Sequence, residues 1–350
     1  MLHGGEVYDK NIDLDFSVNL NPTPCPKKVL DAIRAASKQV GLYPDREQRL
    51  FRQKVAKAEN CLLKKNIISP ENVLGGNGAS ELIHWVIRLL SPGRVLLPIP
   101  CFYGYYHAIE ALSDVSVSEY VLKQEKGFAL DRDFLKEIDN SVDLVILGNP
   151  NNPTGRVIET GLLEKIIKKC KRCGCALIVD ESFLYLSEGS ESAAGFIGSY
   201  KNLFVVSSFT KLFSIPGVRV GYVLSSEKNI QSLQALLPEW NMSVFALAAG
   251  EACADILING GFVEKSLERV AKLRKEMEMD LKERRLIVYP SDTNFILVYS
   301  LKNLYDSFLD RGILIRDCSN FKGLDKGFFR IAVKDEKSYE RIKQCFSFLM

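Results

Sequence analysis

The stretch Leu203-Phe204-Val205-Val206-Ser207-Ser208-Phe209-Thr210-Lys211 runs from apolar residues into a lysine, and Arg219 follows that lysine after eight residues in a loop containing glycine and proline. A lysine amine becomes nucleophilic when desolvation or nearby cations lower its pKa. The planar guanidinium of Arg219 matches phosphate oxygens. The segment therefore predicts that Lys211 holds an aldehyde cofactor as a Schiff base, while Ser208 and Arg219 grip the cofactor's phosphate. A strand end with a surface lysine would give the same pattern.

Short runs of Val, Ile and Leu alternate with helical patterns through the middle of the chain. Such runs, separated by helices, are typical of a mostly parallel sheet covered on both faces. We therefore expect an α/β architecture. The expected strands are 94–97, 115–121, 144–147, 176–179 and 203–206, with helices beginning near 79 and spanning 103–112, 131–138 and 160–171.

Beyond residue 258 the pattern changes to a long charged amphipathic stretch followed by alternating strands. This pattern indicates a smaller α+β domain, which the first 40 residues complete with a helix near 27–39. We predict a large cofactor-binding domain over 41–258 and a small domain built from 1–40 and 259–350. The expected C-terminal elements are a helix over 262–285, strands 287–289, 295–299, 313–316 and 328–333, and a helix over 337–349.

The overall composition is that of an ordinary globular protein, with 350 residues, 47% hydrophobic and 25% charged. A net charge of +3 with both signs interspersed gives no electrostatic case for nucleic acid or membrane as a partner. The first ten residues lack the features of a secretion signal. Nine scattered cysteines suit a reducing compartment, so we expect a cytoplasmic protein.

Three of the cysteines, Cys170, Cys173 and Cys175, lie close together and invite a metal interpretation. Structural zinc sites usually need four ligands, and no histidine or second cysteine pair lies near. The alternative is that these thiols lie between a helix end and the strand that begins near Ala176. We favour this alternative and predict no metal site.

Two further motifs fit the binding of a phosphorylated planar ligand. Gly75-Gly76-Asn77-Gly78-Ala79-Ser80 is a glycine-rich turn that opens a helix, where free backbone N–H groups can bind phosphate. Phe102, in the aromatic stretch 100–105, can lie against a planar ring, although an aromatic core patch would look the same. Ligands bind at the carboxyl ends of strands in open α/β folds, so these segments are expected to converge there.

Two polar motifs follow predicted strands directly. The stretch Asn149-Pro150-Asn151-Asn152-Pro153-Thr154-Gly155 can present an amide to a ligand where a single Asn-Pro would be turn chemistry. Asp180 ends the strand 176–179 and could cap a helix. The sharper interpretation is that Asp180 pairs with a protonated ring nitrogen and makes the ring an electron sink.

The order of these motifs resembles the fold-type I pyridoxal-phosphate enzymes of the class I/II aminotransferase superfamily over essentially the whole chain. The resemblance implies a PLP-dependent transferase fold, with a three-layer α/β/α large domain, a mostly parallel sheet and a smaller α+β domain. It implies pyridoxal 5'-phosphate as cofactor. The matching residues are Gly-Asn-Gly at 76–78, Asn-Asn-Pro-Thr-Gly at 151–155, Asp-Glu at 180–181, Ser-x-x-Lys at 208–211 and Arg219.

The resemblance also implies roles for individual residues. Lys211 forms the Schiff base and later shuttles protons, and Asp180 holds the pyridine nitrogen. Asn152 bonds the ring hydroxyl, and Phe102 stacks on the ring. The remaining cofactor-binding residues lie around the phosphate and are Gly78, Ala79, Ser80, Ser208 and Arg219.

Two more residues match family positions outside the cofactor motifs. Arg330, in the stretch 328–333, matches the arginine that clamps the substrate's α-carboxylate. Tyr43 matches a tyrosine that reaches the cofactor phosphate of the neighbouring subunit. The resemblance therefore implies a homodimer with shared active sites.

Two branches of the superfamily share the pattern: histidinol-phosphate aminotransferases and the threonine-phosphate decarboxylases of cobalamin biosynthesis. The chain is more similar to the decarboxylases at 3–5, 15–22, 238–243 and 315–324, and at Phe183, where transaminases of this group usually carry a ring-binding tyrosine. Decarboxylation of O-phospho-L-threonine, or a close phosphorylated amino acid, to aminopropanol phosphate is therefore expected. Amino transfer from histidinol phosphate to 2-oxoglutarate is the alternative. Arg46 and Ser243 depart from the family pattern and leave substrate detail open.

Four residues are expected to bind the phosphate of the substrate: His3, Asn19, Arg316 and Asn320. For His3 the alternative is a disordered terminus, and for Arg316 it is a structural salt bridge. A different class is the group of transcription regulators that join an aminotransferase-like domain to an N-terminal DNA-binding module. Here the aminotransferase pattern begins by about residue 15, so we expect an enzyme that acts on a small substrate.

Overall fold

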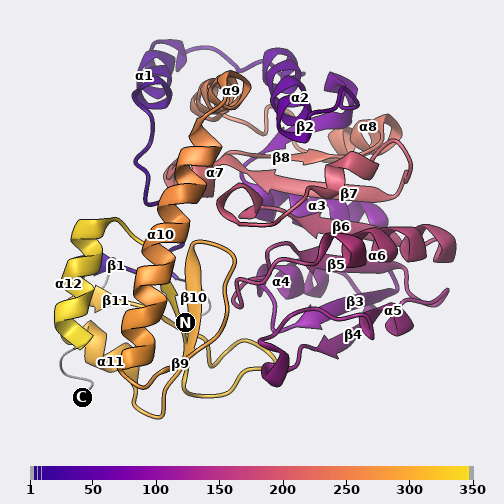
Figure 1. Cartoon of the computed structure of the whole chain (residues 1–350). Helices are drawn as coiled ribbons and strands as arrows, with labels where there is room; N and C mark the ends of the chain where they lie inside the picture. The colour runs from indigo at the N-terminus through magenta and orange to yellow at the C-terminus, as the bar shows by residue number, and fades with distance from the viewer. Residues whose placement is uncertain (1–3, 6, 9, 347–350) are drawn as a thin grey trace.

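The computed structural model describes residues 4–5, 7–8 and 10–346. It contains a seven-stranded sheet, a four-stranded sheet and a two-stranded sheet. Figure 1 shows the large sheet with helices on both sides, and the long helix α10 (Phe262–Glu283) leading from it to the C-terminal elements. This is the three-layer α/β arrangement, with an additional α+β part, that the sequence predicts.

The seven-stranded sheet has the order β2-β8-β7-β6-β5-β3-β4. Only β8 runs against its neighbours, so the sheet is mostly parallel. Its strands are β2 (Val73–Gly76), β3 (Arg94–Ile99), β4 (Ser116–Val121), β5 (Leu144–Gly148), β6 (Ala176–Asp180), β7 (Leu203–Ser208) and β8 (Gly221–Leu224).

Each central strand of this sheet buries both faces, which explains why its sequence is apolar without alternation. In β6, Leu177 and Val179 belong to one core cluster, while Ile178 belongs to another. The first cluster includes residues of α2 (Arg49–Leu63), α6 (Thr160–Cys173) and α9 (Val244–Asn259). The second includes residues of α3 (Ala79–Leu90), α4 (Gly104–Glu110) and α8 (Glu227–Leu236). Helices therefore cover the sheet on both sides.

The five strands predicted for the middle of the chain are all present, whereas β2 and β8 were not predicted. The expected helix over 131–138 is reduced to α5 (Phe134–Glu137). Asp131 accepts hydrogen bonds from the backbone N–H of Asp133 at 3.0 Å and from the hydroxyl of Tyr120. Such a local aspartate turn competes with the first helical turn.

The C-terminal four-stranded sheet is antiparallel in the order β12-β13-β10-β9. Its strands are β9 (Ile287–Val288), β10 (Phe295–Tyr299), β12 (Arg316–Asp317) and β13 (Phe328–Ala332). The single strand expected over 313–316 is wrong. β11 (Ile313–Leu314) pairs with β1 (Leu14–Asp15), while β12 pairs with β13, so the chain changes sheets at Ile315.

The remaining helices are α1 (Lys27–Ala36), α7 (Phe209–Leu212), α11 (Leu304–Leu309) and α12 (Glu336–Phe346). α10 and α11 pack on the C-terminal sheet through Leu273, Met277 and Phe308. α1 lies beside α9 at the top of Figure 1, with Val29 in the core of the large sheet. The predicted domain bounds at residues 40 and 258 stay a prediction.

No single helix in the described part of the chain is long and apolar enough to cross a membrane. The helices α9 and α10, which meet at 87°, are together long and apolar enough to do so.

Cys170 and Cys175 are buried near the end of α6 and the start of β6. Across the residues described, no group of three or more His, Cys, Asp or Glu side chains is placed to hold a metal ion.

Candidate active site

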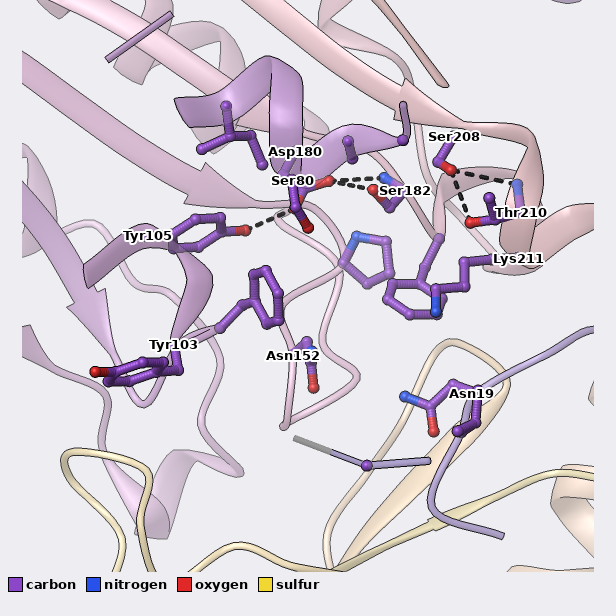
Figure 2. Close-up of a pocket in the computed structure, with 18 of the residues that line it drawn as sticks. Asn19, Ser80, Tyr103, Tyr105, Asn152, Asp180, Ser182, Ser208, Thr210 and Lys211 are labelled. Atoms are coloured by element: carbon purple, nitrogen blue, oxygen red, sulfur yellow. Dashed lines mark hydrogen bonds between the residues drawn. The ribbon is translucent and has the colours of Figure 1, made fainter. Parts of the chain in front are cut away.

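A pocket lies where the carboxyl ends of β5, β6 and β7 face the C-terminal sheet. Figure 2 shows Asp180, Lys211, Asn152 and Asn19 converging on it from separate segments of the chain. The pocket brings together most residues that the sequence singled out. These are Asn19, Gly78, Ala79, Ser80, Phe102, Asn152, Asp180, Ser208, Lys211, Arg219, Arg316 and Arg330.

Two predicted residues that the structure describes, Tyr43 and Asn320, do not line this pocket. Tyr43 is 80% exposed and lies against Trp240, with ring centroids 4.7 Å apart. Asn320 is exposed, and its side-chain oxygen accepts a hydrogen bond from Arg316 at 2.7 Å. His3 lies outside the described residues.

Lys211 lies in α7, directly after β7, and its side chain points into the pocket (Figure 2). Burial lowers the pKa of Lys211 to about 8, and the nearby cations Arg330 and Arg219 add to the effect. The ammonium lies 5.7 Å from the ring centre of Phe183. A neutral amine is therefore within reach near physiological pH, which is what attack on an aldehyde requires.

Asp180 is the last residue of β6 and is surrounded by hydroxyl groups. One carboxylate oxygen accepts from the backbone N–H of Ser182 at 3.0 Å and from its hydroxyl at 2.6 Å, and the other accepts from Tyr105 at 3.0 Å. Burial raises the pKa of Asp180, while these donors and Lys211 oppose that rise. A cationic N–H of a bound ring would favour the charged carboxylate further.

A second part of the pocket is suited to phosphate. Gly78 precedes α3 with φ of 87°, and a Cβ there would come within 2.7 Å of the guanidinium of Arg219. Arg219 donates to the carbonyl oxygen of Asn77 at 3.1 Å, which holds it against the start of α3. Free N–H groups at a helix start and an arginine together form an anion site. Ser208, whose hydroxyl donates to Val220 O at 3.1 Å, completes this side of the pocket.

Arg330 joins three distant segments on the opposite wall. Its guanidinium donates to the carbonyl oxygen of Ser17 at 2.6 Å and to the side-chain oxygen of Asn152. Burial lowers the pKa of Arg330 to about 10, so it remains charged at neutral pH. In the described part of the chain, Arg330 Nε and Asn19 Oδ1 are buried without a hydrogen-bond partner. Such groups are costly unless a ligand satisfies them.

Arg316 stands directly opposite Arg330 in the β12–β13 pair. Both are buried, at 5% and 6% exposure, and both line the pocket. Like charges directly opposite each other destabilise a sheet, so this pair is suited to a ligand that supplies negative charge. The residues fit a phosphorylated aldehyde on one side and an anionic substrate on the other.

Sequence reasoning missed several residues of this pocket: Ser17, Tyr105, Ser182 and Thr210. Ser182 could have been found, because an Asp followed two residues later by Ser is a common turn in which the side chain accepts the backbone N–H. Thr210 lies inside the motif that ends at Lys211, and its hydroxyl lies 2.8 Å from that of Ser208. Tyr105 gave no signal beyond its aromatic stretch, because its contact with Asp180 depends on how α4 packs.

The chain is 34% identical to a putative threonine-phosphate decarboxylase of Caldanaerobacter subterraneus subsp. tengcongensis, over 95% of this chain and 89% of that protein. It is 30% identical to the adenosylcobalamin biosynthesis bifunctional protein CobDQ of Leptospira interrogans, over 99% of this chain but 40% of the length of that protein.

A solved structure agrees closely with the fold. The histidinol-phosphate aminotransferase from Clostridium acetobutylicum superposes with a TM-score of 0.84 at 31% identity, covering 96% of this chain and 98% of that chain. The family model described as aminotransferase class I and II matches residues 11–344. The superfamily, the transferase fold and the pyridoxal 5'-phosphate cofactor expected from the sequence are thereby confirmed. This chain belongs to the class I and II aminotransferase family of pyridoxal-phosphate enzymes.

Proposed function

We propose that this enzyme decarboxylates O-phospho-L-threonine, or a close phosphorylated amino acid, to aminopropanol phosphate in cobalamin biosynthesis. The observation that carries the proposal is the buried arginine pair, Arg316 opposite Arg330, in the wall facing Lys211. Two buried guanidinium groups match a substrate with two anionic groups, a carboxylate and a distal phosphate. The name of the relative from Caldanaerobacter subterraneus supports the same substrate class, and the name of the relative from Leptospira interrogans supports a place in cobalamin biosynthesis.

Bound pyridoxal phosphate supplies an electron sink that stabilises negative charge at the substrate's Cα. In this chain, Lys211 would hold the cofactor and move protons, and Asp180 would keep the ring nitrogen charged. Asn152 would bond the ring hydroxyl, with Phe102 against the ring. The cofactor phosphate would be bound by Gly78, Ala79, Ser80, Ser208 and Arg219, as the geometry near the start of α3 suggests.

The two arginines would then divide the substrate between them. Arg330 would bind the carboxylate, because its guanidinium is already held by Asn152 and Ser17. Arg316 would bind the distal phosphate with Asn320, Asn19 and His3. The bond that breaks at Cα depends on how the substrate is held, so this pair would decide between loss of the carboxylate and loss of a proton.

Decarboxylation is favoured over amino transfer by Phe183. Phe183 lines the pocket, and its ring packs edge-on against that of Phe295, with the ring centres 5.2 Å apart. It offers no hydroxyl where transaminases of this group usually carry a tyrosine. Histidinol-phosphate amino transfer remains the second candidate, supported by the likeness to the aminotransferase from Clostridium acetobutylicum.

The test is incubation of the holoenzyme with O-phospho-L-threonine, with measurement of carbon dioxide and aminopropanol phosphate. Phosphoserine is run beside it, because one methyl group gives only about 1–3 kcal/mol of discrimination. Rapid glutamate formation from histidinol phosphate with 2-oxoglutarate, without carbon dioxide release from phosphothreonine, would overturn the decarboxylase proposal.

We also propose a homodimer in which Tyr43 reaches the cofactor phosphate of the partner subunit. Val40, Leu42 and Tyr43 are 67%, 69% and 80% exposed, and Trp240 beside them is 42% exposed. Exposed apolar side chains grouped in this way favour a protein interface. Light scattering should give twice the chain mass, and Tyr43→Ala should weaken cofactor retention. A monomer that retains full activity would contradict this proposal.

A cytoplasmic location is proposed as well. All nine cysteines are free thiols. These include Cys170 and Cys175, which are both buried and lie five residues apart in the sequence. Free thiols persist in reducing compartments. Fractionation of the native host should find the enzyme with cytoplasmic markers, and recovery from an oxidising compartment would contradict it.

A further inference from the structure

One ion pair joins the loop between β12 and β13 to the far edge of the large sheet. The ammonium of Lys322 lies 2.7 Å from a carboxylate oxygen of Glu119 on β4 and 4.3 Å from the ring centre of Tyr106 on α4. The hydroxyl of Tyr106 donates to the same oxygen of Glu119 at 2.7 Å. These three residues, called the clasp below, connect segments 203 positions apart in sequence. Figure 1 shows this yellow loop reaching across toward β4.

The residues just before Lys322 support Arg316. Phe321 lines the pocket, and the guanidinium of Arg316 lies 5.2 Å from its ring centre. Asn320 accepts a hydrogen bond from Arg316 at 2.7 Å. The loop therefore presents both a ring and an amide to one guanidinium, and each contact depends on where the loop backbone lies.

The loop is also packed against the strand ends that form the cofactor side. Phe321 and Leu324 are buried with Leu122, which follows β4. Gly323 adopts φ of 83°, and a Cβ there would lie 3.4 Å from the backbone nitrogen of Pro100. Pro100 lies two residues before Phe102, which lines the pocket. The loop that the clasp holds therefore packs against both the cofactor side and the substrate side of the pocket.

We propose that the clasp is a positioning device for substrate binding: Lys322, held by Glu119 and Tyr106, fixes the loop so that Phe321 and Asn320 aim Arg316 into the pocket. None of the three clasp residues lines the pocket as described. Their effect would pass through Arg316, so they are positioning residues. The inference rests on the proposed function in one respect, namely that Arg316 binds the distal phosphate.

The experiment compares the holoenzyme with Lys322→Met, Glu119→Gln, Lys322→Glu and the double variant Glu119→Lys/Lys322→Glu. The dissociation constants of O-phospho-L-threonine and L-threonine are measured from the change in cofactor absorbance. Lys322→Met and Glu119→Gln should weaken phosphothreonine binding about three- to tenfold, the range given by an exposed ion pair with a cation–π contact. Threonine, which lacks the phosphate, should be affected less than twofold.

Two variants separate the clasp from general effects of charge. Lys322→Glu should be the weakest binder, and the double variant should recover part of the loss, because the opposite charges face each other again. Lys168→Met is the matched control, since Lys168 forms an exposed ion pair with Glu164 within α6, away from the pocket. An equal loss for phosphothreonine and threonine, or no recovery in the double variant, would overturn the proposal.

Hydrogen exchange gives a readout that does not depend on the reaction. Peptides covering 318–327 should exchange faster in Lys322→Met than in the wild type, and unchanged exchange would overturn the clasp. If the wild type binds neither phosphothreonine nor histidinol phosphate, the proposed function fails, and the exchange result still decides whether the clasp holds the loop.

Discussion

The two walls of the pocket are built in different ways. On the cofactor side, local contacts hold Asp180 to Ser182 and Ser208 to Thr210, and the more distant Tyr105 adds to the contacts of Asp180. On the substrate side, Arg330 is held by Ser17, which lies 313 positions away. Local contacts form wherever the strand ends lie, whereas Arg330 meets Ser17 and Asn152 only when distant segments assemble. We therefore expect cofactor binding to survive changes that abolish substrate binding.

The largest expected effect is on the cofactor side. Lys211→Ala should remove the visible absorbance band of bound cofactor and lower turnover at least about a thousandfold, because the variant lacks both the nucleophile and the proton carrier. Absorbance spectra and steady-state rates measure both. Lys168→Ala, on the surface of α6, should match the wild type. An unchanged spectrum in Lys211→Ala would contradict the assignment of Lys211 as the residue that holds the cofactor.

The next prediction tests whether the two walls are separable. Arg330→Met should lower kcat/KM about a hundredfold, since each bond to a charged group contributes about 1.5–3 kcal/mol, while the absorbance band stays. Arg330→Lys should recover little, because an ammonium does not reproduce the planar fork. If Arg330→Met also loses the cofactor, the contrast between the walls is wrong.

A smaller effect on cofactor affinity is expected at Gly78, where the chain turns into α3 beside the expected phosphate site. Gly78→Ala should weaken cofactor affinity about tenfold, because a Cβ at φ of 87° is strained and would meet Arg219. Gly217→Ala is the control, since among the described residues a Cβ there meets no atom within 4 Å besides those of its chain neighbours. Equilibrium dialysis of both variants against cofactor decides the matter, and equal affinities would contradict the cradle described for Gly78.

The smallest expected effect concerns pH. The neutral amine is the reactive form, so cofactor uptake by the apoprotein should rise with pH and level off above about 8, the lowered pKa of Lys211. Burial is the main cause, and Arg330 adds to it. Arg330→Met should therefore move the midpoint upward, toward the ordinary value for lysine. A midpoint that does not move would show that the substrate wall has no influence on Lys211.

The cofactor side could be predicted from the sequence because its motifs are short and lie at the ends of predicted strands. Asp180, Asn152 and Lys211 each follow an apolar run, and parallel strands bring such ends to one edge. The predicted strands 144–147 and 176–179 match β5 and β6 within one residue. Local chemistry and strand direction were sufficient here.

The substrate side could not be predicted as geometry. The segment 313–316 looks like one strand, but Leu314 and Arg316 belong to strands in different sheets. β8 was missed because four residues are too few for a period, and its antiparallel pairing depends on β2 and β7. That Arg316 faces Arg330 is a matter of register, which sequence pattern alone does not determine.

The three-way junction at Arg330 has a consequence for biosynthesis. Ser17 and Asn152 leave the ribosome before Arg330 does, so the nascent polypeptide can complete its cofactor cradle while the opposing wall is still untranslated. Ribosome-bound chains stalled before residue 330 should therefore bind pyridoxal phosphate yet remain unable to bind the substrate.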